Sequence, residues 1–95
     1  MLEGQPENQT ELLIAKICDD IQALLTQKNR AYGDAALNPI RVFSNASTKE
    51  QILVRIDDKL NRIKQGNNKI DDEDVIQDLI GYLVLLQVWQ KQNEL

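Results

Sequence analysis

The sequence predicts an all-α fold, a small helical bundle of three main helices plus a short helical turn. Apolar residues recur at spacings of three and four along three stretches, and Gly, Pro and Asn cluster between them. The chain has 95 residues, 42% hydrophobic and 27% charged, which is the balance of one small globular domain. Such a domain buries only about 60 to 65% of its unfolded surface, so its core is thin. We expect a flexible arm over residues 1–9 and a single all-α domain over 10–92.

The first helix is predicted over residues 10–31. Neither Gly nor Pro occurs in it, and its apolar stripe consists of Ile14, Ile17, Ile21, Leu24 and Leu25. The following segment, 33–47, holds turn-forming Gly, Asp, Asn and Pro around a short apolar patch, 40–43. We expect an ordered loop there, with one helical turn after Pro39.

A capping box marks the start of the second helix. In Ser47-Thr48-Lys49-Glu50 the serine oxygen satisfies a free amide of the first turn, and the glutamate reaches back to the cap. Gly66, followed by two asparagines, supplies a left-handed stop. The second helix is therefore predicted over residues 48–65.

A third helix is predicted from Asp71 to about Lys91, because four acids at its start face the positive end of the helix dipole. From Leu79 to Trp89 only a glycine and a glutamine are not apolar. This run is shorter than the roughly 20 residues of a membrane span and too apolar for a helix with one wet side. We expect self-association through this helix, and the alternative is that the 40–43 loop folds over it. A strand over 83–88 would have no partner.

Composition excludes several classes of protein. There is no histidine, which excludes imidazole-dependent triads and histidine zinc sites. The single cysteine, Cys18, forms no internal disulfide, and we assign it and Trp89 to packing. A net charge of −4 disfavours duplex nucleic acid as a partner. The polar, acidic start does not read as a signal peptide, so we expect a cytoplasmic protein with no membrane contact.

Some charges fall on the apolar faces of the predicted helices. Lys28 continues the apolar stripe of the first helix. Either its methylene stem packs while the ammonium reaches solvent at the helix end, or the ammonium has a functional role. Asp78 directly precedes the apolar run, where an unpaired buried carboxylate would cost several kcal/mol. It therefore needs a metal ion or a cation, and the candidate cations are Lys28, Arg55, Lys59 and Arg62. A buried ion-pair network that fixes helix register is slightly favoured over a phosphate or metal pocket.

Two tyrosines and one glycine accompany these charges. Tyr32 and Tyr82 could stack on a base or donate to a phosphate, or they could be core-edge residues. Gly81 allows close approach of a ligand or of another backbone, and tight helix packing is the favoured reason.

Three motifs in order resemble one known family. Residues 28–34 read Lys-Asn-x-x-Tyr-Gly-Asp, residues 55–62 read Arg-x-x-Asp-Lys-x-x-Arg, and residues 74–82 read Asp-x-x-x-Asp-x-x-x-Tyr. Over residues 28–86 the chain is similar to the nucleotide modification associated domain family of phages and bacteria. The resemblance implies a ligand with phosphates and a base. It implies as contacts Lys28, Tyr32, Arg55, Lys59, Arg62 and Tyr82.

The chain is also distantly similar to the all-helical nucleoside triphosphate pyrophosphatases of the MazG kind, although their paired Glu-x-x-Glu and Glu-x-x-Asp ligands are absent. One alternative is therefore a magnesium-dependent pyrophosphohydrolase, with Asp58, Asp74 and Asp78 on the metal. Another is a non-catalytic structural or oligomerisation module. We expect a homo-oligomer that binds a nucleotide or another phosphate-containing small molecule. Whether it is an enzyme stays open.

Overall fold

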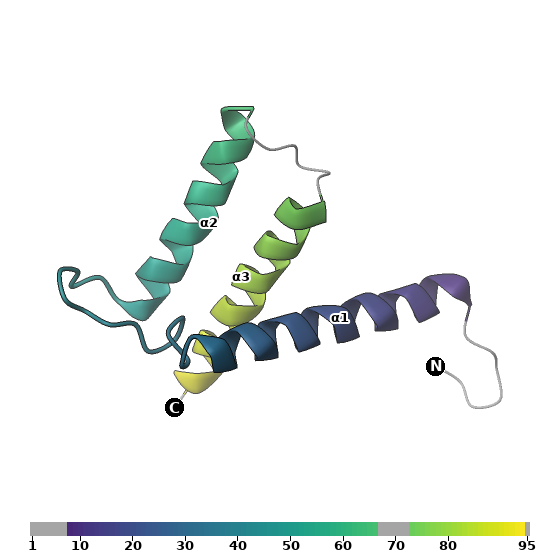
Figure 1. Cartoon of the computed structure of the whole chain (residues 1–95), viewed down its shortest axis with the longest axis horizontal. Helices are drawn as coiled ribbons and strands as arrows, with labels where there is room; N and C mark the ends of the chain where they lie inside the picture. The colour runs from purple at the N-terminus through teal and green to yellow at the C-terminus, as the bar shows by residue number, and fades with distance from the viewer. Residues whose placement is uncertain (1–7, 67–72, 95) are drawn as a thin grey trace.

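The computed structural model describes residues 8–66 and 73–94, without the side chains of residues 73 and 74. The three helices are α1 (Gln9–Ala31), α2 (Thr48–Lys64) and α3 (Glu73–Gln92), and no strand occurs in the residues described (Figure 1). The all-α prediction is confirmed, and the predicted bounds of α1 and α2 and the predicted end of α3 agree to within one residue. The expected arm falls outside the description up to residue 7, as does the predicted acidic start of α3 at residues 71 and 72.

Side-chain caps and left-handed residues define the ends of α1. At its start the Oδ1 atom of Asn8 accepts a hydrogen bond from the Glu11 amide at 2.8 Å. At its end Gly33 adopts a φ of +61°, and the Asp34 amide donates back to the Asn29 carbonyl at 3.0 Å. This is the Schellman arrangement, which satisfies a carbonyl that the helix leaves free.

The predicted serine cap and the left-handed stop of α2 are confirmed. The Ser47 hydroxyl accepts from the Glu50 amide at 3.1 Å. Gly66 has a φ of +80°, and its amide donates to the Ile63 carbonyl at 3.0 Å. These local signals fix both ends of α2 from the sequence alone.

The loop between α1 and α2 differs from expectation in one respect. Turns cover residues 32–37, and residues 39–41 are irregular, so the helical turn expected after Pro39 does not form. The turns form before Pro39 instead. Asp34 has a φ of +63°, and its backbone carbonyl accepts hydrogen bonds from the Leu37 and Asn38 amides. Side chains then tie the loop to the start of α2, since the Arg41 guanidinium donates to the Ala46 carbonyl and to Thr48.

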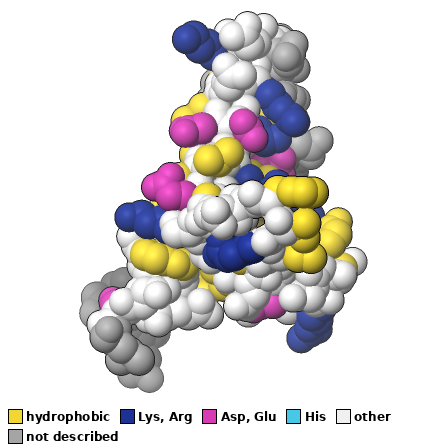
Figure 2. Space-filling model, turned by 90° about the vertical axis from the view of Figure 1, so that its left-hand side faces the viewer, with side chains coloured by type: hydrophobic (Ala, Val, Ile, Leu, Met, Phe, Trp, Pro, Cys, Tyr) yellow, Lys and Arg dark blue, Asp and Glu magenta, His cyan; other side chains and the backbone are white. Residues whose placement is uncertain are grey.

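The apolar patch of this loop does not cover α3. Ile40, Val42 and Phe43 are 85%, 65% and 98% exposed, and hydrophobic side chains are visible at the surface on the side that carries α2 and the loop (Figure 2). The alternative that this loop folds over the third helix is therefore wrong. The loop is held at the start of α2 by Arg41, and its apolar side chains point outward.

Two contacts set the pairing of α2 with α3. Lys59 Nζ lies 2.8 Å from Asp78 Oδ2, and Lys49 Nζ lies 5.6 Å from the centroid of the Trp89 ring. The lysines are ten residues apart along α2 and their partners eleven apart along α3, in opposite directions. At about 1.5 Å per residue these spacings match, so the two helices pack antiparallel in a single register.

The core is thin, as the chain length predicts. In the part of the chain described, the buried hydrophobic residues are Ile21, Ile52 and Val75, one from each helix. Cys18 is exposed, so its assignment to packing is wrong: it lies in the N-terminal half of α1, where residues 9–20 are all exposed. No helix among the described residues combines the length and apolarity that crossing a membrane requires.

The N-terminal half of α1 extends away from the other two helices (Figure 1). All residues from Gln9 to Asp20 are exposed. The radius of gyration is 16.3 Å, whereas a compact chain of this length has about 12 Å. The molecule is therefore a helical hairpin, crossed at one end by a long helix that it covers only in part.

We expect Gly33→Ala to lower the free energy of unfolding by about 1 kcal/mol. A Cβ at this position would meet no atom within 4 Å, so the cost comes from the left-handed backbone and not from a clash. Gly33→Asn should cost less, because Asn tolerates this conformation. Urea unfolding followed by circular dichroism measures both. Equal losses for the two variants would contradict this account.

Candidate ligand-binding cavity

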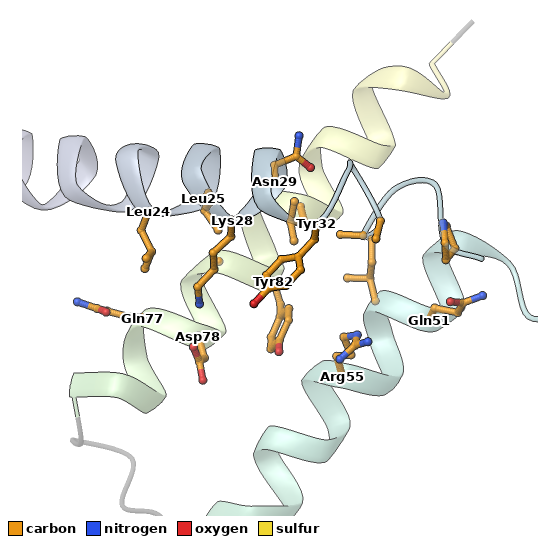
Figure 3. Close-up of a pocket in the computed structure, with 16 residues that line it drawn as sticks. Leu24, Leu25, Lys28, Asn29, Tyr32, Gln51, Arg55, Gln77, Asp78 and Tyr82 are labelled. Atoms are coloured by element: carbon orange, nitrogen blue, oxygen red, sulfur yellow. The ribbon is translucent and has the colours of Figure 1, made fainter. Parts of the chain in front are cut away.

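A cavity of about 530 Å³ lies where the C-terminal half of α1, the loop after it, α2 and α3 meet (Figure 3). Its volume falls within the usual range for small-molecule sites. It is lined by Leu24, Leu25, Lys28, Asn29, Tyr32, Ala35, Ala36, Pro39, Gln51, Ile52, Arg55, Gln77, Asp78, Gly81, Tyr82 and Leu85.

At Gly81 a side chain of α1 packs closely against α3. A Cβ at this glycine would lie 3.1 Å from the Leu25 Cδ2 atom, which is tighter than ordinary van der Waals contact. Gly81 is itself buried. The predicted tight helix packing at this glycine is therefore confirmed, and the close crossing forms one wall of the cavity.

Two cations from different helices line the cavity. Lys28 belongs to the last turn of α1, and Arg55 to the middle of α2 (Figure 3). Within the described part of the chain neither has an acidic group at ion-pair distance. Both are exposed enough to exchange water for a ligand.

The acid that lines the cavity, Asp78, already has a partner. Its Oδ2 atom lies 2.8 Å from Lys59 Nζ, and the two side chains are 34% and 13% exposed respectively. The predicted need of Asp78 for a cation is thus met by Lys59. With this pair neutral, Lys28 and Arg55 give the described cavity wall a local positive charge in a chain whose net charge is −4.

Aromatic and amide side chains complete the wall. Tyr32 is 71% exposed and Tyr82 is partly buried, and both lie among the stick residues of the cavity (Figure 3). Three amides, Asn29, Gln51 and Gln77, also line it, and none of them is among the contacts predicted from the sequence, although Asn29 belongs to the first motif. The signal was available for two of them. Gln51 lies one turn before Arg55, and Gln77 one turn before Gly81.

The structure brings together five of the residues singled out from the sequence: Lys28, Tyr32, Arg55, Asp78 and Tyr82. Lys59 does not line the cavity itself, but it forms an ion pair with Asp78, which does. Arg62 and Asp58 are exposed and do not line the cavity. Arg62 lies about 10 Å further along α2 than Arg55, which places it beyond the cavity end.

The predicted metal ligands are not assembled among the residues that can be described. Asp58 is outside the cavity lining, Asp78 is held by Lys59, and the Asp74 side chain lies outside the description. The described residues contain no group of three side chains that could hold a metal ion. Of the predicted metal ligands whose side chains are described, Asp78 is the one on the cavity wall, and Lys59 is its partner.

Comparisons with known proteins found no match that bears on the site. None of the protein-family models, curated proteins or solved structures compared with this chain matches it. The resemblance to the nucleotide modification associated domain family therefore rests on the three sequence motifs. All three motifs contribute residues to the cavity lining: Lys28 and Tyr32 from 28–34, Arg55 from 55–62, and Asp78 and Tyr82 from 74–82.

We expect Lys59→Met to lower the free energy of unfolding by about 1 to 2 kcal/mol, because it leaves the partly buried Asp78 carboxylate without its cation. The matched control is Lys16→Met. Lys16 pairs with Asp20 at 3.1 Å, but those side chains are 70% and 62% exposed, so a loss below about 0.5 kcal/mol is expected. Chemical denaturation measures both, and equal losses would contradict a structural role for the Lys59–Asp78 pair.

We also expect Gly81→Leu to lower the free energy of unfolding by about 1 to 3 kcal/mol, because the added side chain separates α1 from α3. Gly81→Ala should be nearly neutral. The flexible end of Leu25 can move by a few tenths of an ångström, and alanine favours the helix by about 1 kcal/mol. Thermal unfolding of the three proteins checks the order. A neutral Gly81→Leu would show that the two helices do not pack closely.

Proposed function

We propose that the protein binds a nucleotide or a similar phosphate-containing small molecule in the cavity between its three helices. The observation that supports this most directly is the pair of cations, Lys28 and Arg55, on separate helices of one cavity and without acidic partners in the described chain. Phosphate oxygens are the anions that such a pair of cations binds well.

The rest of the lining suits the remainder of a nucleotide. Tyr32 and Tyr82 offer aromatic faces on which a base can stack. Leu24, Ile52 and Leu85 provide apolar surface beneath it, and amide groups can bond the polar edge of a base. Two cations for the phosphates, next to aromatic and apolar side chains for the base, are the groups that a nucleotide site requires.

A second candidate is a structural module that binds no ligand. The Lys59–Asp78 pair favours it, because a 2.8 Å ion pair between partly buried groups fixes helix register without any ligand. The two candidates differ in what Lys28 and Arg55 do. If the protein is a structural module, Lys28 and Arg55 bind no ligand, and nucleotides do not stabilise the fold.

Thermal-shift measurements with nucleoside mono-, di- and triphosphates, each with and without magnesium, test the proposal. A nucleotide at a hundred times its dissociation constant stabilises the fold by about 2.7 kcal/mol, which raises the melting temperature of a domain this size by roughly 10 °C or more. We expect such a shift. The nucleoside without phosphate should produce a much smaller one, because it lacks the groups that Lys28 and Arg55 bind.

Two arginines of α2 provide a matched pair of variants. Arg55→Gln should reduce nucleotide affinity at least tenfold, the loss expected when one charge-assisted bond to phosphate is removed. Arg62→Gln removes the same charge outside the cavity and should leave affinity within twofold. Titration calorimetry measures both. Equal losses would place the phosphate elsewhere, and absence of any nucleotide-dependent stabilisation would favour the structural module.

A further inference from the structure

The N-terminal half of α1 presents an uncovered apolar face. Its side chains Leu13, Ile14 and Ile17 are 51%, 57% and 53% exposed. Ile14 and Ile17 fall in line with Ile21, which is 8% exposed against α3. The stripe that packs into the core at one end of the helix thus continues for about two turns through the exposed residues 9–20. Scattered apolar residues are ordinary on a surface, but an uncovered stripe marks an interaction site.

The chain as a whole exposes more surface than a compact monomer of its mass. Its exposed area is 7839 Å², whereas a compact monomer of 10.9 kDa exposes about 5,600 Å². A standard dimer interface covers about 800 Å² on each partner, which is less than this difference. The exposed area of the whole chain is therefore sufficient for a contact with a second copy.

The stripe itself favours a like helix as the occupant. Ile14 and Ile17 continue, toward the N-terminus, the three-and-four spacing of Ile21 and Leu24, which is the spacing with which paired helices interdigitate. The uncovered half of α1 carries charges of both signs, Glu11, Lys16, Asp19 and Asp20. Two antiparallel copies oppose their helix dipoles, whereas parallel copies bring like helix ends together.

We propose that a second copy of this chain packs on the N-terminal half of α1, with the two α1 helices antiparallel around a twofold axis. This contact is isologous: the same stripe on each copy covers the other. It is distinct from the cavity, which lies at the C-terminal half of α1. It also differs from the self-association through the third helix predicted from the sequence. On α3 the large hydrophobic side chains exposed, among those described, are Ile76 and Leu83, at 43% and 51%.

Light scattering coupled to size-exclusion chromatography tests the proposal on the full chain. We expect twice the chain mass of 10.9 kDa at micromolar concentration, and the single-chain mass for Ile17→Asp. Ala15→Asp places the same charge in the same half of α1 but on its opposite side, and should stay dimeric. Leu83→Asp and Phe43→Asp probe the apolar residues of α3 and of the loop, and should also stay dimeric.

Cross-linking of the native cysteine supplies a second readout that does not depend on a variant's folding. Cys18 is the chain's single cysteine, is exposed, and adjoins Ile17, so the twofold axis places the two Cys18 thiols near each other. A short bismaleimide should link wild-type chains efficiently at micromolar concentration. Cys18→Ser with Lys64→Cys, which moves the thiol to the end of α2, should link at least tenfold more slowly.

Several results would overturn this proposal. A wild-type chain that remains monomeric at 200 µM would show that the face belongs to another partner. A dimer that survives Ile17→Asp but is lost in Leu83→Asp or Phe43→Asp would move the interface to α3 or to the loop. Equal cross-linking rates for Cys18 and the relocated cysteine would show that the α1 helices do not meet.

Discussion

The ion pair between Lys59 and Asp78 is the constraint on which the rest of the structure depends. A carboxylate placed near the start of the most apolar helix needs a cation, and α2 supplies Lys59 when the two helices run antiparallel in the observed register. That register sets Lys49 against Trp89 at the other end of the hairpin. It also presents Gly81, one turn after Asp78, to α1. α1 then crosses α3 where the absence of a side chain at Gly81 allows Leu25 to approach.

The cavity follows from the same pair. Because Lys59 neutralises Asp78, the acid on the cavity wall does not compete for Lys28 and Arg55. A chain with a net charge of −4 thereby retains a locally positive pocket. The field of such a pocket acts at short range, since salt screens charges over about 8 to 10 Å. The acidic remainder of the surface repels polyanions, whereas a small phosphate ligand can still enter. This combination supports the proposal of a small molecule over duplex nucleic acid.

Helix ends and cavity residues differed in how far the sequence could predict them. The helix ends depend on local hydrogen bonds and local backbone conformation at Ser47, Gly33 and Gly66. Their roles could therefore be predicted from the sequence around each of them. Helical periodicity also placed Lys28 and Asp78 on inward faces. The position of Arg62 depends on how far α2 extends past the cavity, and the exposure of Cys18 depends on how far α1 reaches beyond α3. Both are facts about where helices cross, and no periodicity within one helix encodes them.

One continuous helix carries both the cavity wall and the uncovered apolar stripe. Leu24, Leu25 and Lys28 face the cavity, and Ile14 and Ile17 lie on the same stripe two to three turns earlier, with no break in the helix between them. The proposed second copy and the proposed ligand therefore contact one continuous helix. Any coupling between the two binding events is reciprocal, so each changes the affinity of the other by the same factor. Coupling of this kind makes ligand affinity depend on protein concentration.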